Sequence, residues 1–135
     1  MKVFVDTGAF IALADAADEN HKKAREWYEQ ARAKGTRFVT TNFVVCETLN
    51  YLRMKVSHEV AVGFREGLRK SGLFDIVDIS LRLDDEAFRI FKQYTDKAFS
   101  FTDCTSFAVM QSLKLKNAFA FDRHFDQISG FQRVP

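Results

Sequence analysis

The amino-acid sequence predicts a three-layer α/β/α sandwich around a central, mainly parallel sheet of four to five strands. Three observations predict this fold class. Short apolar runs recur along the chain with little alternation, as in strands that are buried on both faces. Each of the first three runs is followed by segments with helical periodicity. Right-handed crossovers between successive strands then require a parallel sheet with helices on both faces.

The chain fits one domain, residues 1–135, with a substantial hydrophobic core. Hydrophobic residues make up 47% of the sequence and 15 of the residues are Phe, which excludes a disordered chain. One Pro and six Gly leave no room for a flexible linker.

The first strand is expected over residues 2–6. Asp6-Thr7-Gly8 then turns into a helix over residues 9–14. Asp18 is expected to cap a second helix that stops at Gly35. The apolar stripe of this helix consists of Ala24, Trp27, Tyr28 and Ala31.

The second strand is expected over residues 37–40, and Thr40 or Thr41 caps a helix that runs through Glu47 to about Val56. A further helix is expected to start at Ser57 and to end at Gly72.

A third strand is expected over residues 73–79 and is followed by an amphipathic helix. Its apolar face consists of Leu83, Ala87, Ile90, Phe91 and Tyr94. Ser100 or Thr102 caps the last helix, which runs to about Lys114. A fourth strand over residues 117–121 and a short edge strand over 131–134 complete the sheet.

Four acidic residues interrupt or follow apolar runs: Asp6, Glu47, Asp103 and Asp122. Asp6 and Asp122 lie at the carboxyl ends of predicted strands, where open α/β sheets build their sites. Two carboxylates about 4 Å apart repel each other by about 4 kcal/mol at an effective dielectric constant of 20. If the fold gathers all four, they therefore need a cation, and hard oxygen ligands select Mg²⁺ or Mn²⁺ over Zn²⁺.

Each acid also has a purely structural interpretation. Asp6 is compatible with a helix cap, Asp103 with a favourable position at a helix N-terminus, and Asp122 with a turn. Glu47 is compatible with a narrow solvent-exposed face of its helix. The four together favour the metal-site interpretation over these separate explanations.

Charge and cysteine content restrict the possible partners. A net charge of +2 excludes a polybasic coat, so RNA would need a local basic surface, such as one that includes Arg123 or Lys97. Cys46 and Cys104 lack metal-type spacing and are interpreted as small core residues in a reduced, cytoplasmic protein. No apolar run is long enough to cross a membrane. For His124, a surface position in a turn or at a helix start is favoured over a general base.

Four segments in this order resemble PIN-domain ribonucleases, particularly the VapC-type toxins of prokaryotic toxin–antitoxin pairs. The segments are Val3-Phe4-Val5-Asp6-Thr7, Phe38-Val39-Thr40-Thr41 through Glu47, Phe101-Thr102-Asp103-Cys104, and Phe119-Ala120-Phe121-Asp122-Arg123-His124-Phe125. The resemblance covers essentially the whole chain.

This resemblance implies a PIN-like fold and a Mg²⁺- or Mn²⁺-dependent endoribonuclease that leaves 5′-phosphate and 3′-hydroxyl ends. Asp6, Glu47, Asp103 and Asp122 match the acidic positions of the family, with Asp126 as a further metal-ligand candidate and Thr7 as a polar helper. It also implies an antitoxin partner and a homodimer.

Ala120 departs from the family pattern, since Thr or Ser often occupies this position. Thr102 or Thr105 could then supply the water-orienting hydroxyl. The alternatives are a non-catalytic PIN-like binding module and a PIN nuclease that acts in RNA maturation. An aspartate-based phosphatase is disfavoured, because Gly8 stands where that chemistry needs a second Asp.

Overall fold

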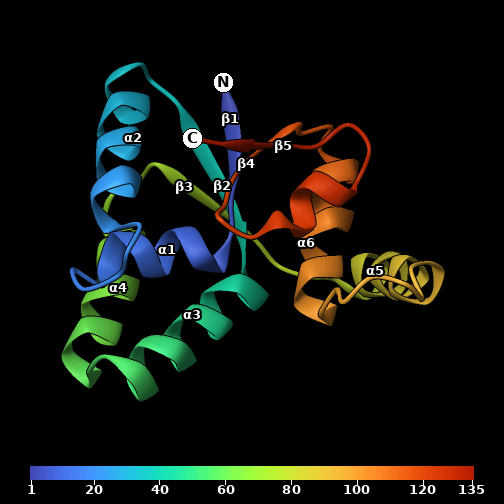
Figure 1. Cartoon of the computed structure of the whole chain (residues 1–135), viewed down its shortest axis with the longest axis horizontal. Coiled ribbons are helices and arrows are strands. Elements are labelled where there is room, and N and C mark those ends of the chain that lie inside the picture. Colours follow the sequence, from blue (N-terminus) through green and yellow to red (C-terminus); the bar gives the residue numbers. More distant parts are fainter.

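The computed structural model describes all residues, 1–135, and has a five-stranded parallel sheet as its centre (Figure 1). The strands are β1 (Lys2–Val5), β2 (Arg37–Thr41), β3 (Phe74–Val77), β4 (Asn117–Phe119) and β5 (Gln132–Val134), in the spatial order β3-β2-β1-β4-β5. All four neighbouring pairs are parallel. The predicted fold class and the expected parallel sheet are therefore confirmed.

Six α-helices flank the sheet: α1 (Thr7–Ala14), α2 (His21–Ala33), α3 (Asn42–Lys55), α4 (His58–Lys70), α5 (Leu81–Gln93) and α6 (Phe101–Ser112). A short 3₁₀-helix, η1 (Arg123–Gln127), follows β4. In Figure 1, α1, α2 and α4 lie to one side of the sheet and α5 and α6 to the other. None of the helices has the length and apolar character needed to cross a bilayer.

Aromatic side chains join each helical layer to the sheet. On one face, Trp27 of α2 packs on Phe119 of β4 with ring centroids 4.5 Å apart, and Tyr28 packs on Phe38 of β2 at 5.3 Å. On the other face, Phe125 of η1 contacts both Phe4 of β1 and Phe107 of α6. Most of the Phe-rich composition therefore serves the core, which fixes the strand ends at which the acids lie.

Most predicted helix starts are confirmed by capping hydrogen bonds. The side chains of Thr41, Ser57 and Ser100 accept main-chain N–H groups at the starts of α3, α4 and α6. The expectation for Asp18 was wrong, because α2 begins later, at His21. The Asp18 carboxylate instead accepts the N–H of Asn20 at 2.9 Å and forms a turn before the helix.

Candidate metal centre

The acids gather at the point where the order of the strands in the sheet reverses. β1 lies between β2 and β4, so chain segments that leave the carboxyl ends of β1 and β4 turn to different elements. Asp6 directly follows β1, and Asp122 lies three residues beyond β4. This reversal is the place where open parallel sheets accommodate ligands.

Asp6 is almost fully buried, with 4% of the residue exposed. It occupies the N-cap position of α1, but its side chain makes no capping hydrogen bond, so the cap interpretation does not explain this acid. The pKa of Asp6 is raised to about 7, mainly by burial and also by the negative charges of Asp103, Asp122 and Glu47, against a lowering effect of the Thr7 main-chain hydrogen bond. An ionised Asp6 therefore needs a positive partner.

Asp103 lies in the first turn of α6 and is also buried. Its Oδ2 accepts the main-chain N–H of Ser100 at 3.0 Å, and the Ser100 hydroxyl oxygen accepts the N–H of Asp103 at 3.0 Å. This reciprocal pair is a capping box. The helix-start interpretation of Asp103 is thus correct, yet it uses only one of the two carboxylate oxygens.

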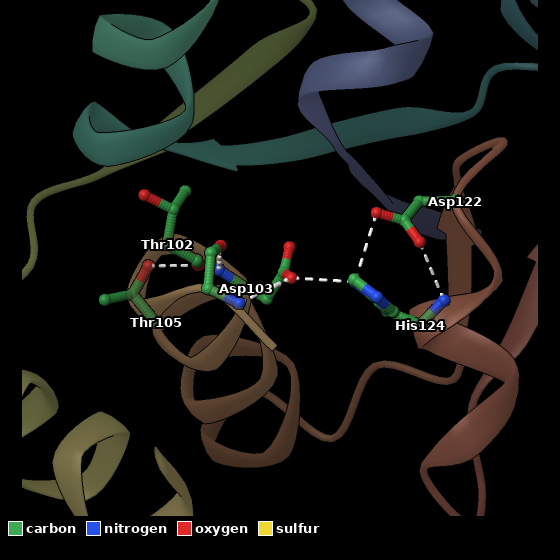
Figure 2. A network of polar contacts seen from close by, with 6 residues as sticks. Thr102, Asp103, Thr105, Asp122 and His124 are labelled. Carbon is green, nitrogen blue, oxygen red and sulfur yellow. Dashed lines mark hydrogen bonds and ion pairs between the residues drawn. The ribbon is translucent and has the colours of Figure 1, made fainter. Parts of the chain in front are cut away.

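Asp122 and His124 complete a compact cluster with Asp103 (Figure 2). One ligand atom of each residue lies within 4.8 Å of those of the others. Asp122 Oδ1 accepts the main-chain N–H of His124 at 2.9 Å, and Asp122 Oδ2 lies 3.2 Å from His124 Nδ1. Asp122 is therefore both a turn residue, as its structural interpretation proposed, and a member of the cluster.

His124 was expected at the surface, in a turn or at a helix start; it does lie at the start of η1, but its side chain is only partly exposed and contacts the acids. Its Nδ1 lies 2.8 Å from Asp103 Oδ2, and the side chain is 27% exposed. Both neighbours are carboxylates, which only accept hydrogen bonds, so Nδ1 carries the proton. The residue was missed because η1, which turns the ring inward, has no clear signature in the sequence.

Glu47 lies at the edge of the cluster, in the second turn of α3. It is exposed, as the solvent-face interpretation requires, but its charge still acts on the buried Asp6. It lines a surface pocket of about 500 Å³ together with Asn42, Phe43, Cys46, Asn50 and Thr102. Of the four acids that match the family positions, three are thus partly or fully buried and Glu47 lies at the rim.

Asp126 lies apart from this cluster. The Arg133 guanidinium binds its carboxylate at 2.9 to 3.0 Å and donates a further hydrogen bond to the carbonyl oxygen of Phe121. The structure therefore gives Asp126 a clear role in joining η1 to β5. It does not bring Asp126 together with Asp103, Asp122 and His124.

The hydroxyl groups near the acids differ in their availability. Thr7 Oγ1 is buried and has no hydrogen-bond partner, so a polar atom directly after Asp6 is unsatisfied. Thr105 donates its hydroxyl to the Thr102 carbonyl at 2.6 Å, so this group is already engaged. The unsatisfied Thr7 oxygen and the Asp6 carboxyl with its raised pKa are both consistent with a site for a hard cation, which binds oxygen ligands.

The two cysteines do not form a nucleophilic site. Cys104 is buried, and burial raises the pKa of its thiol to about 11, with a further contribution from Asp103. A thiol of this kind is largely protonated near neutral pH and is a poor nucleophile. Cys46 is exposed, so the expected core role was right for Cys104 and wrong for Cys46.

Comparisons with known proteins agree with this geometry. Residues 3–130 match the family model described as PIN domain. The chain is 32% identical over 132 residues to the 23S rRNA-specific endonuclease VapC20 of Mycobacterium tuberculosis, which covers 98% of this chain and 97% of that protein. It is also 32% identical over 127 residues to the VapC ribonuclease of Archaeoglobus fulgidus, covering 93% and 80% of the two chains.

Solved structures show the same fold. The crystal structure of M. tuberculosis VapC20, described as a toxin that cleaves the sarcin–ricin loop, superposes with a TM-score of 0.88 at 31% identity and covers 98% of both chains. VapBC2 from Rickettsia felis, bound to a promoter DNA fragment, has a TM-score of 0.76 at 10% identity, with 99% and 98% covered. At that identity the second likeness concerns the fold alone.

Proposed function

The chain belongs to the PIN domain family and to its VapC ribonucleases, and from this membership we propose that it is a divalent-metal-dependent endoribonuclease. It hydrolyses phosphodiester bonds of RNA and acts as the toxin of a toxin–antitoxin pair. PIN-domain nucleases generally depend on divalent metal ions, and the acidic cluster of this chain agrees with that requirement.

The single observation that carries the proposal is the electrostatic state of Asp6. A buried carboxyl whose pKa is raised to about 7 by burial and by three other acids has no stabilising cation among the protein groups around it. We assign Asp6, Asp103 and Asp122 as the principal metal ligands and Glu47 as a ligand at the rim. Their all-oxygen donor set favours Mg²⁺ or Mn²⁺.

When bound, Mg²⁺ or Mn²⁺ would polarise the scissile phosphate and lower the pKa of a water molecule. The chain itself contributes positioning and proton transfer. A carboxylate oxygen of Asp122 that does not bind the cation would accept a proton from water. The hydroxyl of Thr102, which lines the Glu47 pocket, is a candidate to orient that water where Ala120 offers none. The products then carry 5′-phosphate and 3′-hydroxyl ends.

For the substrate, we propose a structured loop of ribosomal RNA. The support is the full-length similarity to VapC20, which is named for its action on 23S rRNA and the sarcin–ricin loop. A loop presents unstacked nucleotides, which proteins recognise more readily than the deep major groove of an RNA helix. A net charge of only +2 also favours binding of a compact RNA loop over non-specific binding to many phosphates of an extended RNA.

For the partner, we propose an antitoxin segment that occupies an apolar cleft between α1, α2 and α4. The cleft has a volume of about 300 Å³, and its aromatic lining includes Phe10, Tyr28, Phe64 and Phe74. Arg25 and Glu29 lie at the same cleft and can pair with charges that flank an apolar anchor. Support from related proteins comes from the VapC family, whose members act in toxin–antitoxin pairs.

The test uses purified protein and a hairpin RNA with the sarcin–ricin loop, in Mg²⁺, in Mn²⁺ and in EDTA. We expect cleavage only with metal. Asp6→Asn and Asp103→Asn should each reduce the rate by more than about 100-fold. Loss of a group that only supports a metal ligand typically costs about 10- to 100-fold, and loss of the ligand itself should cost more.

Asp75→Asn is a matched control for the loss of one carboxylate. Asp75 is exposed and pairs with Arg37 near the amino end of the sheet, remote from the cluster. We expect this variant to cleave at the wild-type rate. Equal cleavage in EDTA would refute metal dependence, and full activity of Asp6→Asn and Asp103→Asn would refute the ligand assignment.

A further inference from the structure

His124 is held at several points, which is unusual for a partly exposed histidine. Its Nδ1 contacts Asp103 Oδ2 at 2.8 Å and Asp122 Oδ2 at 3.2 Å. Its main-chain N–H is donated to Asp122 Oδ1, and its ring packs edge-on against Phe99 with centroids 5.4 Å apart. The imidazole therefore has one defined orientation (Figure 2).

These contacts join two acids that arrive from distant parts of the chain. Asp103 starts α6, whereas Asp122 follows β4. His124 links the two carboxylates: its ring Nδ1 is hydrogen-bonded to Asp103, its main-chain N–H is donated to Asp122, and Nδ1 also lies within ion-pair distance of Asp122. The ring offsets the repulsion between the carboxylates and fixes the distance between the two segments.

The same contacts separate the oxygens of Asp103 into two kinds. Oδ2 receives both the Ser100 main-chain N–H and the His124 ring N–H. Oδ1 receives no hydrogen bond within the protein and is therefore available to bind a cation. A cation can therefore bind Asp103 without displacing the imidazole.

Resting on the proposed metal site, we infer that His124 is a positioning residue: its ring, which is hydrogen-bonded to Asp103 through Nδ1 and in ion-pair contact with Asp122, holds the two acids so that the remaining carboxylate oxygens can bind the divalent cation. Outer hydrogen-bond partners commonly fix the ligands of metal sites in this way. A competitor of the cation or a direct ligand would not need a ring that packs edge-on against Phe99, is hydrogen-bonded to Asp103 and lies within ion-pair distance of Asp122.

The experiment measures Mn²⁺ binding to the metal-free full chain by calorimetry and by electron paramagnetic resonance of Mn²⁺, at one fixed pH. The variants are His124→Ala, His124→Asn and His124→Gln. The Asn amide nitrogen occupies nearly the same place along the side chain as Nδ1 and donates a proton, whereas the Gln nitrogen corresponds to Nε2.

We expect His124→Ala to weaken Mn²⁺ binding by about 10- to 100-fold. His124→Asn should restore most of the affinity and His124→Gln should not. Ser57→Ala removes the cap of α4, far from the acids, and serves as a control for a general loss of stability. This control should bind Mn²⁺ as the wild type does.

Tighter binding by His124→Ala would show that the imidazole competes with the cation, and would overturn the inference. Equal losses in the Ala and Asn variants would identify a direct ligand and would overturn it as well. If His124→Ala does not fold, the difference between Asn and Gln decides the question alone. Failure of the wild-type protein to bind Mn²⁺ would instead refute the proposed metal site, which keeps the two failures distinguishable.

Discussion

At the scale of single residues, the acids of this site perform structural and electrostatic tasks together. Asp103 caps α6 with one oxygen, and Asp122 closes the turn before η1. Local hydrogen bonds of this kind are available to any helix start or turn. What sets the site apart is that these carboxylates also crowd a third one, Asp6, which is buried and makes no capping hydrogen bond.

The raised pKa of Asp6 predicts how the stability of the metal-free protein changes with pH. Asp6 binds its proton up to a pH of about 7 in the folded state, but only to about 3.8 in the unfolded chain. Between these values the folded state holds more protons, so the free energy of unfolding falls as the pH rises. The Asp6 contribution is at most about 4 kcal/mol over this range. Chemical denaturation in EDTA, from pH 4 to pH 8, measures it.

Asp6→Asn is the control for this pH dependence, because Asn keeps the shape without the titrating group. We expect a flatter profile for this variant and, at pH 8 without metal, a higher stability than that of the wild type. Saturating Mg²⁺ should stabilise the wild type at pH 8 and leave Asp6→Asn nearly unchanged. A wild-type profile that rises between pH 4 and pH 7 in EDTA, with Asp6→Asn parallel to it, would contradict this account.

Sequence patterns could identify the acids but not every side-chain direction. Asp6, Asp103 and Asp122 were predictable because each follows an apolar run that the sheet must bury. Within η1, by contrast, the backbone turns His124 toward the cluster and Asp126 toward Arg133. These directions depend on the tertiary contacts of Phe99 and β5, which no local pattern encodes.

At the scale of elements, the helix starts determine where the functional groups lie. α3 begins directly after β2, and its cap fixes the helix that presents Glu47. The cap was predictable because Thr40 and Thr41 precede an apolar helical run. The start of α2 was not, since Asp18 and Asn20 are both suitable cap residues and the intervening turn decides between them.

Thr41→Ala should destabilise the protein through the start of α3. The Thr41 side chain is fully buried and accepts the N–H of Val44 at 3.0 Å. Losing a cap of this kind costs about 1 kcal/mol, which corresponds to a decrease of about 4 °C in Tm for a domain of this size. Differential scanning calorimetry measures the change.

Thr41→Ser retains the capping oxygen and should recover most of the lost stability. The comparison separates the hydrogen bond from the loss of a buried methyl group, which both substitutions cause. If Thr41→Ser is as unstable as Thr41→Ala, packing rather than capping explains the position.

At the scale of the whole molecule, a helical surface on α5 remains uncovered. Leu81 and Phe88 lie seven residues apart on one face of the helix, with 85% and 52% of each residue exposed, and Phe91 lies beside Phe88. Exposed apolar patches of this kind are uncommon on monomers and are typical of interfaces. We propose this α5 surface as the interface of the expected homodimer.

A double variant, Leu81→Arg with Phe88→Arg, should disrupt this homodimer by placing charges in its interface. Size-exclusion chromatography with light scattering should give twice the chain mass of 15.6 kDa for the wild type and the single chain mass for the variant. Val62→Arg, at an exposed position on α4, is the control and should remain dimeric. A monomeric wild type, or a dimeric double variant, would rule out this surface.

The position of β4 beside β1 also affects when the site can form during translation. β1 is translated before its neighbour β4 and before Asp122, the acid that follows β4. A nascent chain that has not reached residue 122 already contains Asp6, Glu47 and Asp103, yet it lacks the partner strand that would bring them into register with Asp122. The complete acidic cluster can therefore form only after residue 122 has been translated and β4 has paired with β1.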